Sequence, residues 1–170
     1  MDTDKQVMKD RLFMDIAIRL SQESHCAKKH VAAVAVKNKR IVGTGVNGTP
    51  SGTVNCDDHW KDDWLKTAPS LSFQEYTQRP GWREKHTAWS KIHEIHAEQN
   101  LIVEASRNLV SLEGTDIYVT LEPCADCAKL LAAIRPKRVI FQDPYLKGSP
   151  ETRELLIACG IEVSCLGALL

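Results

Sequence analysis

The hydrophobic and polar positions of the chain follow helical spacing in some segments and strand spacing in others. Apolar residues within 10–20 recur mostly three or four positions apart, which predicts an amphipathic helix. The β-branched runs 31–36 and 41–46 are joined by a polar turn and predict a hairpin. We further expect helices at about 94–107, after Pro123 and at 151–158, and strands at 116–121, 138–141 and 161–164.

The segment 48–90 interrupts this pattern. It is rich in glycine, proline, aspartate and tryptophan and has no clear period. We therefore expect a long loop insertion that is functional or tied down, within a single domain covering 1–170. The alternation of strands and helices elsewhere predicts an α/β fold with helices on both faces of a sheet.

Composition narrows the function classes. Twenty-two basic residues balance twenty-two acidic ones, so the chain lacks the overall positive charge typical of nucleic-acid binding. The first residues contain no apolar h-region, and no stretch has the length of a membrane span, so we expect a cytoplasmic protein without a signal peptide or a membrane partner. In such a chain, six cysteines favour thiolate metal ligands over a disulfide framework.

Two short segments carry candidate metal chemistry. HEIHAEQN contains His96 and Glu98, and TLEPCADCAK contains Cys124 and Cys127 after Pro123, a residue suited to the first turn of a helix. The cysteine pair alone also fits redox or structural sites. Three protein ligands with one open position are typical of catalytic zinc. For Glu98 to reach the same ion as His96, the helix that contains Glu98 must begin near Glu94. Both expected helix N-termini favour thiolates.

These segments resemble the zinc-dependent nucleoside and nucleotide deaminases, whose signature is H-x-E followed by P-C-x-x-C. SHCAKKHVAAV and VNGTPSGTVNC resemble further motifs of the deoxycytidylate (dCMP) deaminase branch, especially its phage type, so the resemblance covers most of 21–163. It implies a cytidine-deaminase-like three-layer α/β/α sandwich with a mixed sheet of about five strands. It also implies hydrolysis of dCMP to dUMP and ammonia, which feeds dTMP synthesis.

The resemblance assigns roles to particular residues. It implies that one Zn²⁺ is held by His96, Cys124 and Cys127, and that Glu98 carries protons to and from the substrate. The candidate substrate-binding residues are Asn47 for the sugar, the backbone at Pro123 for the base, Lys28 or Lys29 for the phosphate, and Tyr145 for the pocket wall. A common turn, a solvated lysine and a packed tyrosine are the simpler alternatives.

In the phage-type branch a second, structural zinc has two cysteines, a histidine and a glutamate as ligands. The matching residues are Cys26, Cys56, His86 and Glu94. Such a site would fasten 48–90 to the sheet and to the catalytic helix. The alternatives are a core thiol, an exposed histidine and a helix-capping acid, and the substitute ligands are His25, His59 and His93. Simple packing is expected for Cys159 and Cys165.

Related enzymes are commonly hexamers activated by dCTP and inhibited by dTTP, so the resemblance implies a homohexamer with these effectors. Three other functions remain open. A tRNA adenosine deaminase shares both zinc motifs but should have a basic face. A cytidine deaminase needs no phosphate anchor. A zinc-stabilised binding module without catalysis would need a fourth protein ligand beside His96, and none is evident.

Overall fold

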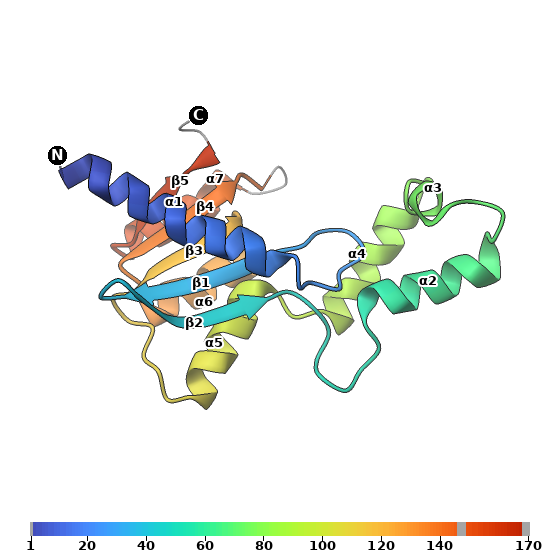
Figure 1. Ribbon diagram of the computed structural model, residues 1–170, viewed down its shortest axis with the longest axis horizontal. Helices are drawn as coiled ribbons and strands as arrows, with labels where there is room; N and C mark the ends of the chain where they lie inside the picture. The colour runs from blue at the N-terminus through green and yellow to red at the C-terminus, as the bar shows by residue number, and fades with distance from the viewer. Residues whose placement is uncertain (1, 146–148, 168–170) are drawn as a thin grey trace.

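The computed structural model describes residues 2–145 and 149–167 (Figure 1). The helices are α1 (Asp2–Ser21), α2 (Cys56–Thr67), α3 (Phe73–Thr77), α4 (Trp82–His93), α5 (Ala97–Arg107), α6 (Ala125–Ile134) and α7 (Pro150–Ala158). The strands are β1 (Ala32–Lys37), β2 (Arg40–Val46), β3 (Asp116–Leu121), β4 (Arg138–Asp143) and β5 (Glu162–Cys165). None of the described helices combines the length and apolar character that a bilayer crossing requires.

Within the described ranges the strands form a five-stranded mixed sheet in the order β2-β1-β3-β4-β5. The pairs β2–β1 and β1–β3 are antiparallel, whereas β3–β4 and β4–β5 are parallel. Asn38 and Lys39 have positive φ angles of 51° and 64° and connect β1 to β2, as in the tight turns that suit the twist of a hairpin. The predicted hairpin and mixed sheet are therefore confirmed.

The strand residues alternate between two apolar layers, as the period of a strand requires. On one face α1 covers the sheet and packs Phe13, Met14 and Ala17 against Val34, Val36, Tyr118 and Ile140. On the other face α5, α6 and α7 pack against Ala33, Ala35, Ile117, Val119 and Val139. The three-layer α/β/α sandwich expected from the sequence is confirmed.

Glycine on the edge strand lets α5 approach β2 closely. A Cβ atom built on Gly45 would lie 2.1 Å from the carbonyl oxygen of Ala97 and 2.4 Å from the amide nitrogen of Leu101. Both atoms belong to the backbone of α5, so no side-chain rotation would relieve the overlap. Gly45 therefore determines how close the first turn of α5 lies to the sheet.

A buried ion-pair network fixes α1 to the ends of β3 and β4. The Asp10 carboxylate accepts hydrogen bonds from the Tyr118 hydroxyl at 2.7 Å and from the Arg138 guanidinium at 3.0 Å. Arg138 also contacts Asp116 at 2.7 Å. Burial raises the pKa of Asp10, but the hydrogen bonds from Arg138, Tyr118 and Gln6 outweigh it and lower that pKa below its ordinary value.

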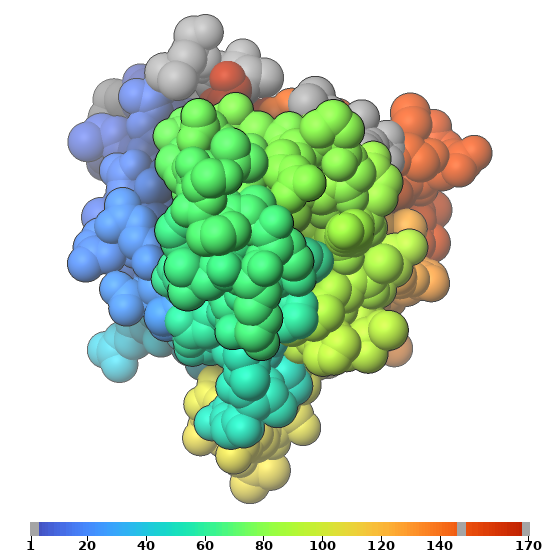
Figure 2. All heavy atoms as spheres, turned by 90° about the vertical axis from the view of Figure 1, so that its right-hand side faces the viewer, coloured from blue at the N-terminus to red at the C-terminus, as the bar shows by residue number. Residues whose placement is uncertain are grey.

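The expectation of an irregular loop over 48–90 was wrong. This segment is described throughout, and it forms α2, α3 and α4, which make a lobe beside the sheet (Figure 1) and cover much of one end of the molecule (Figure 2). Trp60, Tyr76 and Trp82 are buried together inside the lobe. The helical period was missed because these helices pack around one small aromatic cluster and not along a continuous apolar face. In addition, α3 has only five residues and begins with a capping box at Ser72.

Two expected helix starts also need correction. The helix expected from about Glu94 begins at Ala97, with His96 as its N-cap, while Glu94 caps the end of α4. Likewise α6 begins at Ala125 with Cys124 as its N-cap, so Pro123 precedes the cap and does not lie in the first turn. In both cases a metal-binding type of side chain occupies the position where a hydroxyl or carboxylate cap is usual.

Candidate metal centres

The first candidate centre lies where the N-termini of α5 and α6 meet. His96 Nδ1 lies 3.5 Å from Cys124 Sγ and 3.4 Å from Cys127 Sγ. The three ligand atoms all lie within 4.8 Å of one another. The two N-cap positions and the first turn of α6 therefore bring one nitrogen and two sulfurs together.

Glu98 lies beside this cluster in the first turn of α5. Its side chain is buried, with 4% of the residue exposed, and it interacts with Cys127. Burial raises the pKa of the Glu98 carboxyl above its usual value. His96 is the N-cap and Glu98 lies in the first turn, and each affects the pKa of the other, so the two residues are near one another even though α5 begins later than expected.

The thiols of the first cluster have very different proton affinities. Hydrogen bonding from Cys127 lowers the pKa of Cys124 to about 4, and the same bond raises the pKa of Cys127. The Cys124 thiolate in turn raises the pKa of His96 through a hydrogen bond. A divalent cation in place of the shared proton would stabilise both thiolates, and one nitrogen with two sulfurs is a typical zinc donor set. Among the described residues no fourth ligand atom joins this cluster.

The second candidate centre connects the lobe to the sheet layers. Its members are Cys26 before β1, Cys56 at the start of α2, His86 on α4, and Glu94 at the end of α4. His86 Nε2 lies 3.3 Å from Cys56 Sγ and 3.6 Å from Cys26 Sγ, and Cys26 Sγ lies 3.6 Å from Glu94 Oε2. The structure brings together the four residues named from the sequence.

The chemistry of the second cluster also fits zinc. Four donors of zinc-binding type form a closed set, as in structural sites. Within the described part of the chain, Glu94 Oε1 is buried without a hydrogen-bond partner, while Oε2 of the same carboxylate lies at Cys26 Sγ. Burial, together with the nearby Cys26 thiolate, raises the pKa of Glu94 to about 7. A bound cation would favour the carboxylate in this site.

The substitute ligands considered from the sequence lie outside both clusters. His25 lies 3.5 Å from an Asp57 carboxylate oxygen. His59 and His93 stack on Trp89, each with a ring-centroid distance of 4.5 Å. These three histidines thus have other contacts.

Asn47 orders the loop between α1 and β1. Its Oδ1 accepts hydrogen bonds from Ser24 Oγ at 2.7 Å and from the Val31 amide at 2.8 Å, while its Nδ2 donates to the Lys29 carbonyl at 2.9 Å. The Ser24 hydroxyl oxygen also accepts a hydrogen bond from the Cys26 amide at 3.2 Å. Ser24 was missed in the sequence because a serine in a polar segment gives no distinctive signal.

The remaining substrate candidates occupy two places. Lys28 donates from Nζ to Thr87 Oγ1 on α4 at 3.1 Å, so it faces the lobe. Lys29 Nζ lies 6.0 Å from the ring centroid of Tyr145, which follows β4. Pro123 is buried next to Cys124, and the Tyr145 amide donates to the neighbouring Glu122 carboxylate at 2.9 Å. Lys29 and Tyr145 are thus close together, whereas Lys28 points elsewhere.

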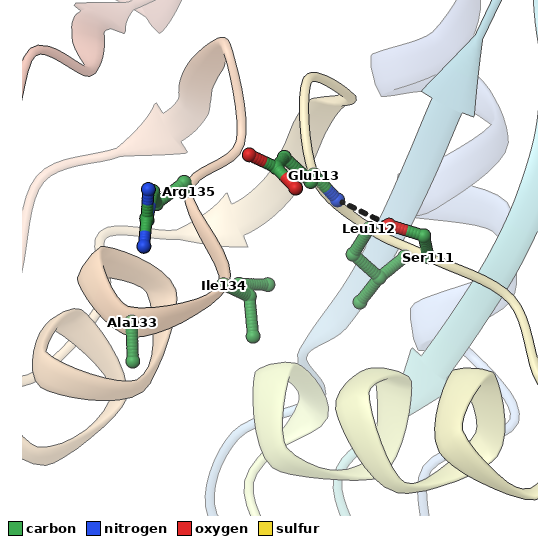
Figure 3. Close-up of a pocket in the computed structure, with 6 residues that line it drawn as sticks. All are labelled: Ser111, Leu112, Glu113, Ala133, Ile134 and Arg135. Carbon is green, nitrogen blue, oxygen red and sulfur yellow. Dashed lines mark hydrogen bonds between the residues drawn. The ribbon is translucent and has the colours of Figure 1, made fainter.

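A hollow of about 330 Å³ lies at the opposite ends of β3 and β4 from the first metal cluster. It is lined by Ser111, Leu112, Glu113, Ala133, Ile134 and Arg135 (Figure 3). None of the candidate metal or substrate residues lines it, so we do not assign it to the reaction.

Comparison with known proteins identifies a family and several relatives of this chain. The family model described as the cytidine and deoxycytidylate deaminase zinc-binding region matches residues 7–143. The deoxycytidylate deaminases of Enterobacteria phages T2 and T4 are each 40% identical over 171 aligned positions, which cover 92% of this chain and 91% and 89% of those proteins. The crystal structure of dCMP deaminase from the cyanophage S-TIM5 in complex with dCMP and dUMP is 28% identical, with a TM-score of 0.67, and the match covers 92% of this chain and 95% of that one.

Proposed function

Because the chain belongs to the cytidine and deoxycytidylate deaminase family, we propose that it is a deoxycytidylate deaminase, which hydrolyses dCMP to dUMP and ammonia. The observation that carries this proposal is the convergence of His96, Cys124 and Cys127 beside the buried Glu98 carboxylate. The relatives named above supply the substrate class. The product dUMP would then feed dTMP synthesis.

His96, Cys124 and Cys127 are the proposed ligands of the catalytic zinc. When bound, zinc supplies a Lewis acid that brings the pKa of a water molecule from about 15.7 towards about 7. In our proposal Glu98 accepts a proton from the attacking water and delivers it to N3 of cytosine as the oxygen adds to C4. Glu98 then takes the proton of the hydroxyl group on C4 and passes it to the amino group, which leaves as ammonia while the C4 carbonyl forms.

Glu98 suits both halves of this proton transfer. Its burial beside the cluster holds the carboxylate in one place for both transfers, and the same burial raises its pKa, which makes it a stronger base for the first transfer than an ordinary glutamate. The buried Pro123 backbone is the proposed contact for the base, and Asn47 the proposed contact for the sugar. Of the two lysines, Lys29 is the better phosphate candidate, because its ammonium group lies near Tyr145 whereas that of Lys28 donates to the lobe.

We propose a second, structural zinc held by Cys26, Cys56, His86 and Glu94. Support comes from the closed set of four donors and from the Glu94 carboxylate, whose second oxygen, Oε1, is buried without a partner among the described residues. Glu94 precedes His96 by two residues, so this zinc would also steady the start of α5.

The finer parts of the proposal concern organisation. We propose that residues 1–170 form one domain that works in the cytoplasm as a homohexamer, activated by dCTP and inhibited by dTTP. The support is the resemblance to phage-type dCMP deaminases. Sedimentation and ammonia-release measurements with and without each triphosphate would test the assembly and the regulation separately.

The substrate test is a direct comparison of ammonia release from dCMP, deoxycytidine and dCTP. If a lysine binds the 5′-phosphate, dCMP should be preferred over the nucleoside, because charge-assisted hydrogen bonds of about 1.5–3 kcal/mol each are absent without the phosphate. Equal efficiency with deoxycytidine and dCMP would favour a cytidine deaminase instead.

A further inference from the structure

Glu122 is a buried carboxylate that belongs to neither metal cluster. It lies between the end of β3 and Pro123, two residues before Cys124. Its Oε2 accepts hydrogen bonds from the Tyr145 amide at 2.9 Å and from Arg153 Nη2 at 2.9 Å, and its Oε1 accepts from Arg153 Nε. Its own amide donates to the Asp143 carbonyl at 2.8 Å.

These contacts connect three separate segments. Asp143 ends β4, Tyr145 follows it, and Arg153 belongs to α7. The Arg153 guanidinium carbon also lies 5.0 Å from the ring centroid of Phe141 on β4, which restricts its orientation. A two-pronged arginine pair with a buried carboxylate has a well-defined geometry, so the pair holds the residues after β4 against the residues after β3.

The position of Tyr145 matters because its ring is the neighbour of Lys29. We propose that Glu122 is a positioning residue. Together with Arg153 it fixes Tyr145 relative to the Pro123–Cys124 turn, and it thereby sets the affinity for the nucleotide. This inference rests on the proposed function, in which Tyr145 and Lys29 contact the substrate.

The chain contains a matched control for this pair. Asp116 and Arg138 form another arginine–carboxylate pair at the opposite ends of the same two strands, and they are register partners in the β3–β4 ladder. In this control pair the arginine, Arg138, is largely buried. In the Glu122–Arg153 pair the carboxylate is the buried member. Loss of either pair should destabilise the sheet, but only loss of the first should displace Tyr145.

The kinetic experiment compares Glu122→Gln and Arg153→Gln with Asp116→Asn in otherwise unchanged, zinc-loaded protein. Both variants of the first pair should raise KM for dCMP on the order of tenfold, the size of effect expected when one charge-assisted hydrogen bond is lost. Their kcat and zinc content should stay close to the parent values. Arg153→Lys should recover part of the loss, because one ammonium hydrogen bond remains possible. Asp116→Asn should leave KM unchanged.

A second measurement does not depend on turnover. Hydrogen–deuterium exchange of a peptide containing Tyr145 reports the hydrogen bond from its amide to Glu122. Exchange should be faster in Glu122→Ala than in the parent, and unchanged in Asp116→Asn. This measurement remains informative if the kinetic variants are too unstable to assay.

The outcomes that overturn the proposal are distinct. Parent-like KM values in both Glu122→Gln and Arg153→Gln would refute it, and so would an equal rise in KM in Asp116→Asn. A fall in kcat with loss of zinc would instead make Glu122 a support of the metal-binding turn. If the parent released no ammonia from dCMP, the proposed function would fail, while amide exchange would still decide whether Glu122 holds Tyr145.

Discussion

Substitution of Gly45 by alanine should uncouple the catalytic helix from the sheet. The new Cβ would lie 2.1 Å from the Ala97 carbonyl oxygen, whereas ordinary contact begins at 3.4 Å, so the backbones must separate by up to the difference of about 1.3 Å. Ala97 lies between the proposed ligand His96 and the proposed proton carrier Glu98. A displacement of about 1 Å in a catalytic group can cost about 10²-fold in rate, so we expect a loss of that order in kcat/KM.

Gly43→Ala is the matched control on the same strand. Among the described residues its Cβ would meet only Leu101 Cδ1, at 2.9 Å, and this flexible side-chain end can move aside. Both substitutions change the flexibility of the unfolded chain similarly, so the difference between them isolates the backbone overlap. Overpacking of the Gly45 kind typically costs about 1–3 kcal/mol of stability, and we expect a smaller loss for Gly43→Ala.

The assay is ammonia release from dCMP at several substrate concentrations, with urea unfolding and zinc content measured on the same preparations. Gly45→Ala should lose activity at a temperature where it remains folded, and Gly43→Ala should stay near the parent. Parent-like kcat/KM in Gly45→Ala would refute the reasoning. An equal loss in both variants would show that strand flexibility, and not the approach of α5, is responsible.

Four further results are expected. Glu98→Ala should retain zinc but lose about 10²- to 10⁴-fold in kcat, since general acid–base help is typically of this size; normal ammonia release would exclude the proton-carrier role. Metal analysis should give two zincs per chain, falling to one in Cys56→Ala with faster proteolysis of 56–93, and a count of one in the active parent would disprove the second site. Lys29→Ala should narrow the preference for dCMP over deoxycytidine, while an unchanged ratio would move the phosphate contact elsewhere. Because the folded-state pKa of Asp10 is lowered, its stabilisation is present above its ordinary pKa of 3.8 and is lost as the pH falls through the folded-state pKa. Urea unfolding of Asp10→Asn between pH 2 and 7 should therefore show a flatter acid dependence than the parent, and identical slopes would contradict this.

Much of the fold could be predicted because strand and helix periods are strong in the sandwich. Strand 116–121 was placed correctly to both ends, since its β-branched and aromatic residues alternate between two buried layers. The lobe was missed because its helices bury a local aromatic cluster beside two cysteines, which leaves no long amphipathic stripe to detect.

The candidate ligands could be named from the sequence, but their local setting could not. The helix starts predicted at Glu94 and Pro123 were wrong because His96 and Cys124 act as the N-caps, and neither side chain is a usual capping signal. Glu122 stood in the motif that contains Cys124, yet its partner Arg153 is 31 residues away. Pairings at such separations depend on strand order, which periodicity does not specify.

The second cluster also bears on how much enzyme a cell obtains. Cys26 lies 60 residues from His86 and 68 from Glu94, so their encounter requires the closure of long loops. With zinc as the proposed occupant, the free energy of metal binding offsets the entropy cost of this loop closure only when an ion binds. The rate at which newly made chains fold the lobe would therefore depend on the concentration of free zinc. Until then Trp60 and Trp82 would stay accessible to chaperones and proteases, and in zinc-poor cells the yield of folded enzyme would fall before the activity of each folded molecule did.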